Sequence, residues 1–508
     1  MSQAERRVEI ETRTSRAAAG MHPQPLAPRT AAALAMVCIS VFFALSLAVD
    51  ARRLLWYDEI STLALARLPS MASIWSAMYK PIDASTPTYL LLERLFDSAF
   101  HQTALSARLL SSLAVAAGLG VVYNAVARLA GGLFGLIAVG LLVCSFLPYY
   151  SYEARAYGLD FFISALALWV WLHVNESSWR FPLLFGVCCF LGELTHYYFA
   201  LCLVPYFVYE LLAGWRRRQV FALIGGCTGV LFACGILLPA ALAIRALSKQ
   251  FWAQITLSSL NVFEHFFPYA MAPLAGVAIC LTLLSFVHQR PNAPLAGIGR
   301  MSPAEQLGWL FLLIPITGMA VGRLVTHAFV DRYFIGFLPG VAMAAACFCS
   351  RLMQGGLFAP GAVALVLLGF GLGQQTMVAA HPEIVDPFHD QQTKTRYAMM
   401  LEPVILKDSK RFIVVADPLL FLESHFYSHH PNMYPYIPVG GETTEAITLT
   451  NMAQLGLFQL WTMDELMAHG PEIALIDPTE GLVRQLRRNG YKLTVRTVYP
   501  LPIVYIEK

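Results

Sequence analysis

Long apolar runs separated by short polar breaks restrict the fold of this chain more than any other feature of the sequence. The first run, residues 31–49, carries no charged side chain and has about the length that crosses the hydrocarbon core of a bilayer. Charged residues make up 13% of the sequence, against about a quarter in soluble domains. We therefore expect an α-helical polytopic membrane protein with about eleven transmembrane helices. The expected spans are residues 31–49, 104–127, 133–149, 157–173, 181–195, 197–213, 220–243, 268–287, 306–321, 333–350 and 357–378.

The distribution of arginine predicts which side of the membrane each loop faces. Residues 215–219, Trp-Arg-Arg-Arg-Gln, form the densest positive cluster between the runs, and the positive-inside rule places it in the cytoplasm. Residues 1–30 then form a cytoplasmic tail, and residues 50–103 form a large first extracytoplasmic loop. Within that loop, residues 63–79 have the period of an amphipathic helix lying on the membrane surface. The net charge of +3 comes mostly from basic residues beside apolar runs, so it implies no nucleic-acid partner.

Residues 380–508 follow the membrane domain of residues 31–379 and have the composition of a water-soluble domain on the extracytoplasmic side. Strand and helix patterns alternate there, which is typical of a small α/β layer domain, and the segment is long enough to bury a modest core of its own. Glu423, His425 and His429 have a near-helical spacing that suits zinc, although polar side chains that simply face solvent are the simpler explanation. The expected strands are residues 411–415, 472–476, 492–498 and 503–507, and the expected helices are residues 418–427 and 480–488.

Two adjacent acids, Asp58 and Glu59, follow the first apolar run. Acidic side chains at the edge of a bilayer are costly unless a wet cavity or a partner accommodates them, so both are candidates for chemistry. The alternative for Asp58 is that it caps a helix starting at Glu59, a role that contributes about 1 kcal/mol. Glu59 either orients Asp58 or holds a divalent ion, or it is a solvated acid favoured by the helix dipole.

Five short motifs occur in an order that resembles a known class of membrane enzymes. They are residues 56–59 (Trp-Tyr-Asp-Glu), 86–92 (Thr-Pro-Thr-Tyr-Leu-Leu-Leu), 152–157 (Tyr-Glu-Ala-Arg-Ala-Tyr), 195–197 (Thr-His-Tyr) and 331–333 (Asp-Arg-Tyr). In this order they resemble the integral-membrane glycosyltransferases of the GT-C class, and most of all the bacterial branch related to protein O-mannosyltransferases and the lipid A aminoarabinose transferase. The resemblance covers the membrane part and the general layout of the C-terminal region. It departs at residues 85–88, Ser-Thr-Pro-Thr, where many relatives have a His-Pro-Pro stretch, so a contact made by that histidine is not carried over.

The resemblance implies transfer of a sugar, a hexose or a pentose, from a polyprenyl-phosphate carrier to an acceptor hydroxyl of a lipid, glycan or protein. It implies that the reaction takes place at the extracytoplasmic face of a bacterial inner membrane, where membrane lipids surround the protein. Such a transfer needs a base near the attacking hydroxyl. The resemblance assigns this role to Asp58.

A departing lipid phosphate gains negative charge, so cations at the outer interface should stabilise the transition state. Arg332, with Tyr333 beside it, is the best candidate because a planar guanidinium matches phosphate oxygens. The alternative is ordinary snorkelling of Arg332 from a helix end. Further candidates for binding the donor headgroup are Arg155 and Glu153 in the second outer loop and Lys80 in the first.

Two histidines on the outer side, His196 and His265, are candidates to contact the acceptor or to complete a metal site with Glu59. A lone histidine is more often simply part of a hydrogen-bonded structure. The sequence therefore establishes no cofactor and leaves a divalent metal open.

A transporter or flippase of lipid-linked sugars would also need many spans and a few interfacial charges. Transporters tend to place ionisable groups near the bilayer midplane and to show repeated halves or broken helices. In this chain the acids cluster at the outer ends of the spans, beside a large first loop and an outer domain. That arrangement favours an enzyme acting at the interface.

Overall fold

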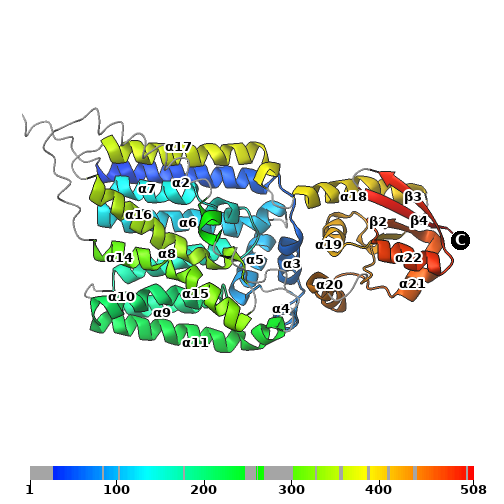
Figure 1. The fold of residues 1–508 in the computed structure, drawn as a ribbon, viewed down its shortest axis with the longest axis horizontal. Helices are drawn as coiled ribbons and strands as arrows, with labels where there is room; N and C mark the ends of the chain where they lie inside the picture. The colour runs from blue at the N-terminus through cyan, green and yellow to red at the C-terminus, as the bar shows by residue number, and fades with distance from the viewer. Residues whose placement is uncertain are drawn as a thin grey trace, which may run out of the picture.

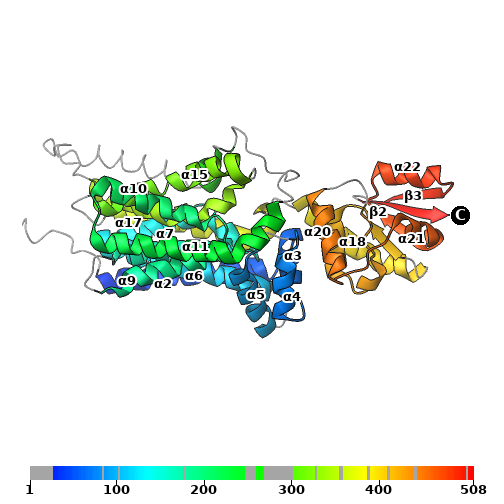
Figure 2. The ribbon, with the colours of Figure 1, turned by 90° about the horizontal axis from the view of Figure 1, so that it is seen from below.

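A long helical bundle and a smaller C-terminal domain at one end of it make up the protein (Figure 1). Helices α3, α4 and α5 lie at the end of the bundle that faces this domain, and both views place α3 between the two parts (Figures 1 and 2). The computed structural model describes residues 27–507 except 83–84, 101–102, 175–177, 246–258, 260, 268–300, 327–328, 354–357, 386–388, 409–411, 439–442 and 499–500.

The bundle is built from the apolar helices that the long runs predict. Six of the described helices are long and apolar enough to cross a membrane, and three shorter apolar helices accompany them, so the chain is a multi-pass membrane protein. The expected span at residues 268–287 lies outside the described residues, and the number of about eleven spans stays a prediction. The bundle contains α2 (Pro28–Asp50), α6 (Ala104–Ala130), α7 (Gly132–Val143), η1 (Leu147–Ser151), α8 (Tyr157–Leu172), α9 (Arg180–Glu193), η2 (Phe199–Leu203), α10 (Val204–Ala213), α11 (Arg217–Arg245), α12 (Val262–Phe266), α14 (Pro303–Leu310), α15 (Leu313–Val321), η5 (Gly322–Thr326), η6 (Asp331–Phe337), α16 (Leu338–Leu352) and α17 (Phe358–Ala380).

Small residues let α9 and α11 approach closely. A side-chain carbon added at Gly229 of α11 would lie 2.5 Å from the carbonyl oxygen of Gly186 in α9. Close backbone approach through small residues is a common packing mode of membrane helices, because lipid provides no hydrophobic driving force between them. The contact fixes α9, whose C-terminal end leads to His196.

The first loop between α2 and α6 folds into α3 (Tyr57–Ala66), α4 (Met71–Met78) and α5 (Pro87–Ala99). The single amphipathic helix expected at residues 63–79 is therefore wrong. The helix ends after Ala66, and Ser70 starts the next one by accepting a hydrogen bond of 3.1 Å from the Ser73 backbone. Most of α3 is buried, because the C-terminal domain packs on it.

The C-terminal domain contains a four-stranded mixed sheet in the order β1-β2-β4-β3. Strands β1 and β2 are parallel, with Phe412 opposite Ile473, and β4 is antiparallel to both of its neighbours. This confirms the small sheet-and-helix domain expected from the sequence. Its elements are α18 (His389–Asp408), β1 (Phe412–Val415), α19 (Pro418–Tyr427), α20 (Thr444–Gln454), α21 (Met463–Ala468), β2 (Ile473–Ile476), α22 (Glu480–Arg488), β3 (Lys492–Val498) and β4 (Leu501–Glu507), preceded by η7 (Pro382–Val385) and with the short η8 (Pro431–Met433) and η9 (Gly470–Glu472).

The two faces of this sheet pack against different parts of the protein, because successive residues of a strand point to opposite sides. Leu475 of β2 packs in a cluster with Leu482 and Leu486 of α22. Its neighbour Ile476 belongs to a second cluster that also contains Ile60 of α3. Only the first cluster is the domain's own, and the second is continuous with the first loop.

Candidate active site

Asp58 and Arg332 form an ion pair in which Oδ2 of Asp58 lies 3.2 Å from Nη2 of Arg332. Asp58 stands in the first turn of α3, and Arg332 is the second residue of η6. Helix α3 begins at Tyr57, with Trp56 in the N-cap position, so the alternative in which Asp58 caps a helix starting at Glu59 is wrong. The two side chains are 25% and 16% exposed, which leaves the carboxylate accessible while its partner is largely enclosed.

Two aromatic rings flank the Arg332 guanidinium. Its carbon lies 5.9 Å from the ring centre of Trp56 and 5.6 Å from that of Tyr157, within the range of cation–π contacts. Its Nε is buried and has no hydrogen-bond partner among the described residues. Arg332 is thus an enclosed cation with N–H donor capacity left for an anion, and it does not snorkel into solvent.

The loop between η1 and α8 brings Glu153 and Arg155 to the same place. Arg155 Nη1 donates to the Asp58 carbonyl oxygen (3.2 Å) and to Thr62 Oγ1 (2.7 Å), so it braces the first turns of α3. Glu153 is 1% exposed, and neither of its carboxylate oxygens has a hydrogen-bond partner within the described part of the chain. Burial raises the pKa of Glu153 to about 7, against the lowering effect of the Arg332 charge.

Glu153 should make the binding of an anion at Arg332 depend on pH. Below about pH 7 its carboxyl is protonated and neutral, and above that pH its negative charge would compete with an anionic ligand for Arg332. If that ligand is the donor phosphate that the motif resemblance implies, we expect the donor KM of the wild type to rise about fivefold, or about 1 kcal/mol, between about pH 6 and pH 8. In Glu153→Gln the donor KM should stay near the low-pH value throughout. Glu402→Gln, a change at another buried carboxylate, should keep the wild-type profile, and a KM in Glu153→Gln that still rises would contradict this role.

Glu59 forms a fully buried ion pair with Arg108 of α6. Nε and Nη2 of Arg108 lie 2.7 and 2.6 Å from its two carboxylate oxygens, and both side chains are 0% exposed. The backbone N–H groups of Trp56 (3.1 Å) and Ala154 (2.7 Å) also donate to this carboxylate. Burial acts to raise the pKa of Glu59, but the charge and hydrogen bonds of Arg108 outweigh it, and the pKa is lowered overall. The solvated alternative for Glu59 is wrong, because its side chain is 0% exposed. Its occupied oxygens favour a role in positioning α3, and a catalytic or metal-binding role stays a prediction.

His196 lies in an aromatic cluster beside the ion pair. Its ring centre is 5.8 Å from that of Tyr157 and 5.3 Å from that of Tyr333, and its Nδ1 has no hydrogen-bond partner among the described residues. Burial, together with the charges of Arg155 and Arg332, lowers the pKa of His196 to about 3. The ring is therefore neutral at physiological pH and suited to a polar contact with a neutral ligand group.

No metal site that joins Glu59 and His196 is seen among the described residues. Glu59 is occupied by Arg108, and two arginines near His196 disfavour a cation. Over the described ranges, no group of three or more His, Cys, Asp and Glu side chains is placed to hold a metal ion. His265 falls in α12, but its side chain lies outside the described residues, so its role stays a prediction.

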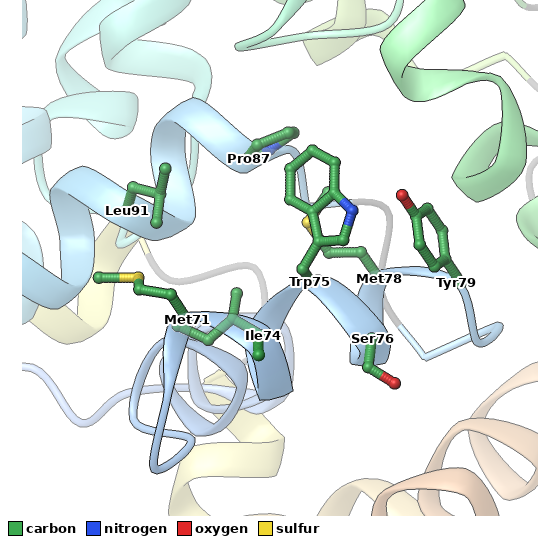
Figure 3. Close-up of a pocket in the computed structure, with 9 residues that line it drawn as sticks. Met71, Ile74, Trp75, Ser76, Met78, Tyr79, Pro87 and Leu91 are labelled. Carbon is green, nitrogen blue, oxygen red and sulfur yellow. The ribbon is translucent and has the colours of Figure 1, made fainter.

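Lys80 follows α4, and its backbone N–H donates to the Ala77 carbonyl oxygen. Tyr79, the residue before it, lines an open, mainly apolar pocket of about 690 Å³ between α4 and α5 (Figure 3). No ion pair of its ammonium group with a described residue is seen. A contact of Lys80 with the donor headgroup stays a prediction. The pocket is lined by Met71, Ala72, Ile74, Trp75, Ser76, Met78, Tyr79, Pro87 and Leu91.

Sequence reasoning missed Arg108 and the aromatic partners of Arg332. A signal for Arg108 existed, because a charged residue inside an apolar run usually has a buried partner. Trp56 and Tyr157 belong to two of the quoted motifs, but no motif shows that both rings meet one guanidinium. The Asp58–Arg332 pair joins residues 274 positions apart, a separation that local patterns do not encode.

The fold of this chain is similar to that of solved membrane proteins with a GT-C fold, so the resemblance seen in the motifs is confirmed at the level of the fold. ArnT from Cupriavidus metallidurans bound to undecaprenyl phosphate superimposes with a TM-score of 0.61 at 14% identity, covering 92% of this chain and 96% of that one. The apo state of the same protein gives a TM-score of 0.62 at 13% identity over the same shares. An oligosaccharyltransferase from Archaeoglobus fulgidus in the apo form aligns more weakly, with a TM-score of 0.44 at 11% identity over 77% of this chain and 63% of that one. Comparisons with protein-family models and with curated proteins find no match. The ArnT likeness establishes the fold.

Proposed function

We propose that this protein transfers a sugar from a polyprenyl-phosphate donor to an acceptor hydroxyl, with Asp58 as the general base. The observation that carries the proposal is the pairing of Asp58 with a guanidinium that keeps a buried, unpaired N–H donor. ArnT, whose fold this chain shares, was solved bound to undecaprenyl phosphate, which supports a polyprenyl phosphate as the ligand of Arg332.

The proposed location is the extracytoplasmic face of a bacterial inner membrane. Arginine placement supports a cytoplasmic N-terminal tail, and α3 lies at the end of the bundle that faces the C-terminal domain (Figures 1 and 2). The site and the C-terminal domain therefore share one side of the membrane. Donor and acceptor would both reach the site from that side.

The transfer involves three events at the anomeric carbon of the sugar. The acceptor oxygen forms a bond to this carbon, and the bond from this carbon to the phosphate oxygen breaks with its electron pair on the phosphate. The hydroxyl proton of the acceptor moves to the Asp58 carboxylate, as general base catalysis requires. The Arg332 guanidinium stabilises the negative charge that grows on the phosphate.

Donor binding would prepare the base. In the free protein Arg332 occupies Oδ2 of Asp58 at 3.2 Å. An incoming phosphate forms charge-assisted hydrogen bonds with the same guanidinium and leaves that oxygen open to the acceptor proton. Asp58 thus becomes available only when a donor is present.

Reconstitution into liposomes with a labelled polyprenyl-phosphate sugar and candidate lipid, glycan and peptide acceptors tests the proposal. The expected result is label on an acceptor and release of polyprenyl phosphate. Movement of the labelled lipid across the bilayer without any chemical transfer would refute the transferase and support the flippase.

Arg332→Lys should lower kcat/KM for the donor about tenfold to a hundredfold, or about 1.4 to 2.7 kcal/mol. Lysine keeps the positive charge but loses the planar fork that fits phosphate and that lies within cation–π distance of Trp56 and Tyr157. The matched control is Arg351→Lys, because Arg351 is similarly enclosed (12% exposed) and pairs with Glu305 at 2.7 Å. Initial rates at varied donor concentration measure kcat/KM for both variants. An equal loss of kcat/KM in Arg351→Lys and Arg332→Lys would mean that Arg332 does not bind the donor.

A further inference from the structure

The C-terminal domain caps the helix that carries Asp58. One carboxylate oxygen of Glu423 in α19 accepts a hydrogen bond of 3.2 Å from the backbone N–H of Tyr57, 366 positions away. The other accepts a hydrogen bond from the Thr395 hydroxyl of α18. Glu423 is 1% exposed and both of its carboxylate oxygens accept hydrogen bonds, so it is neither a solvated surface residue nor free to bind zinc. A carboxylate at the first residue of a helix satisfies an N–H group that lacks a partner inside the helix and complements the helix dipole.

Neighbouring backbone groups are held by the same domain. The N–H of Leu55 donates to the Tyr427 hydroxyl oxygen at 2.5 Å. Gln392 Nε2 donates to the Leu54 carbonyl oxygen at 3.3 Å. Three polar side chains of the C-terminal domain therefore fix the segment that enters α3.

The membrane bundle holds this segment from the other side. Arg108 donates to the carbonyl oxygens of Arg53 and Leu54, both at 2.8 Å. Glu59, the partner of Arg108, accepts the N–H of Trp56 at 3.1 Å. The entry to α3 is thus clamped between two buried carboxylates, one from the helix itself and one from the C-terminal domain.

We infer that Glu423 is a positioning residue for the proposed reaction, and that the C-terminal domain completes the active site by fixing the first turn of α3. The inference rests on the proposed function for its kinetic consequence. Helix α3 has only 10 residues, so its first turn, which includes Asp58, depends on capping to stay ordered. Without Glu423 the Tyr57 N–H loses this carboxylate acceptor, and Asp58 is held less firmly at one position relative to Arg332.

Glu423→Ala, Glu423→Gln and Glu402→Ala in the full-length protein test the inference. Glutamine keeps an oxygen that accepts the Tyr57 N–H, so it should rescue the effect of alanine. Glu402 is the matched control because it is also buried (4% exposed) and accepts two hydrogen bonds, from Ser428 at 3.0 Å and Tyr434 at 3.3 Å. Its partners lie within the C-terminal domain.

Two readouts separate the positioning role from the proposed function. Hydrogen–deuterium exchange of the amides of residues 55–60 should accelerate in Glu423→Ala and stay at the wild-type rate in Glu423→Gln and Glu402→Ala. In the transfer assay Glu423→Ala should lose about 10- to 100-fold in kcat at unchanged donor KM. If the wild type shows no transfer, the proposed function fails while the exchange result still decides the positioning role.

Wild-type exchange at residues 55–60 in Glu423→Ala would overturn the inference, and so would an equal loss of kcat in Glu402→Ala. If Glu423→Ala does not accumulate in the membrane, the same exchange measurement is made on Tyr427→Phe. This change removes only the hydroxyl that accepts the Leu55 N–H. It should accelerate exchange at residues 55–60 while leaving the ring packing in place, and unchanged exchange there would overturn the inference.

Discussion

Asp58→Asn is expected to abolish sugar transfer while leaving the protein folded and able to bind a polyprenyl phosphate. Asparagine has nearly the same shape, and its carbonyl oxygen can keep the hydrogen bond to Arg332. It takes no proton from the acceptor hydroxyl, and loss of a general base costs about 10²- to 10⁴-fold in rate. Initial rates of transfer at saturating donor measure the effect, and donor binding to the purified variant shows that the site is intact.

Asp477→Asn is the matched control for this change. Asp477 is 24% exposed and pairs with Lys394 at 3.0 Å, close to the 25% and 3.2 Å of Asp58. Its φ of 48° lies in the left-handed region, which asparagine adopts readily. The control should transfer at the wild-type rate, and a well-folded Asp58→Asn protein with full transfer would rule out Asp58 as the base.

Arg108→Ala is expected to lower the free energy of unfolding by about 3–5 kcal/mol, because it leaves a buried carboxylate without its counter-charge. It also removes the donors to the carbonyl oxygens of Asp50, Arg53 and Leu54. The loss should be seen as an earlier transition in SDS titration of the protein in mixed micelles.

Arg484→Ala is the control for charge removal alone. Arg484 pairs with Glu480 at 3.5 Å, but both side chains are largely exposed (69% and 93%), and exposed pairs contribute little. Its transition should coincide with that of the wild type. If Arg108→Ala also unfolded at the wild-type SDS concentration, the buried Glu59–Arg108 pair would not stabilise the first loop.

The sequence predicted the bounds of a helix or strand well where a local pattern of apolar and polar residues determines that element. The helices at Pro418–Tyr427 and Glu480–Arg488 and the strand at Lys492–Val498 have the expected bounds. In α22 the reason is visible, because Leu482 and Leu486 are one turn apart and buried among polar neighbours. Apolar runs of bilayer length likewise marked the long membrane helices.

The first loop shows where local patterns fail. Apolar residues from 63 to 79 indicated one surface helix, whereas the chain breaks between Ala66 and Met71. The apolar residues of α3 pack under the C-terminal domain, so their pattern records burial against a distant segment and not contact with a membrane. Glu423 was misjudged for the same reason, since its partner lies 366 positions away.

The sequence by itself determined that this is a multi-pass membrane protein with a small C-terminal α/β domain, and it singled out Asp58 and Arg332 as candidates. Bilayer-length apolar runs and strand and helix periodicities are local properties, so the order of residues is enough to show them. Only the tertiary structure paired Asp58 with Arg332, enclosed Glu59 with Arg108 and placed Glu423 at the start of α3. These contacts join residues 49 to 366 positions apart, and which charges meet is decided by the packing of whole helices.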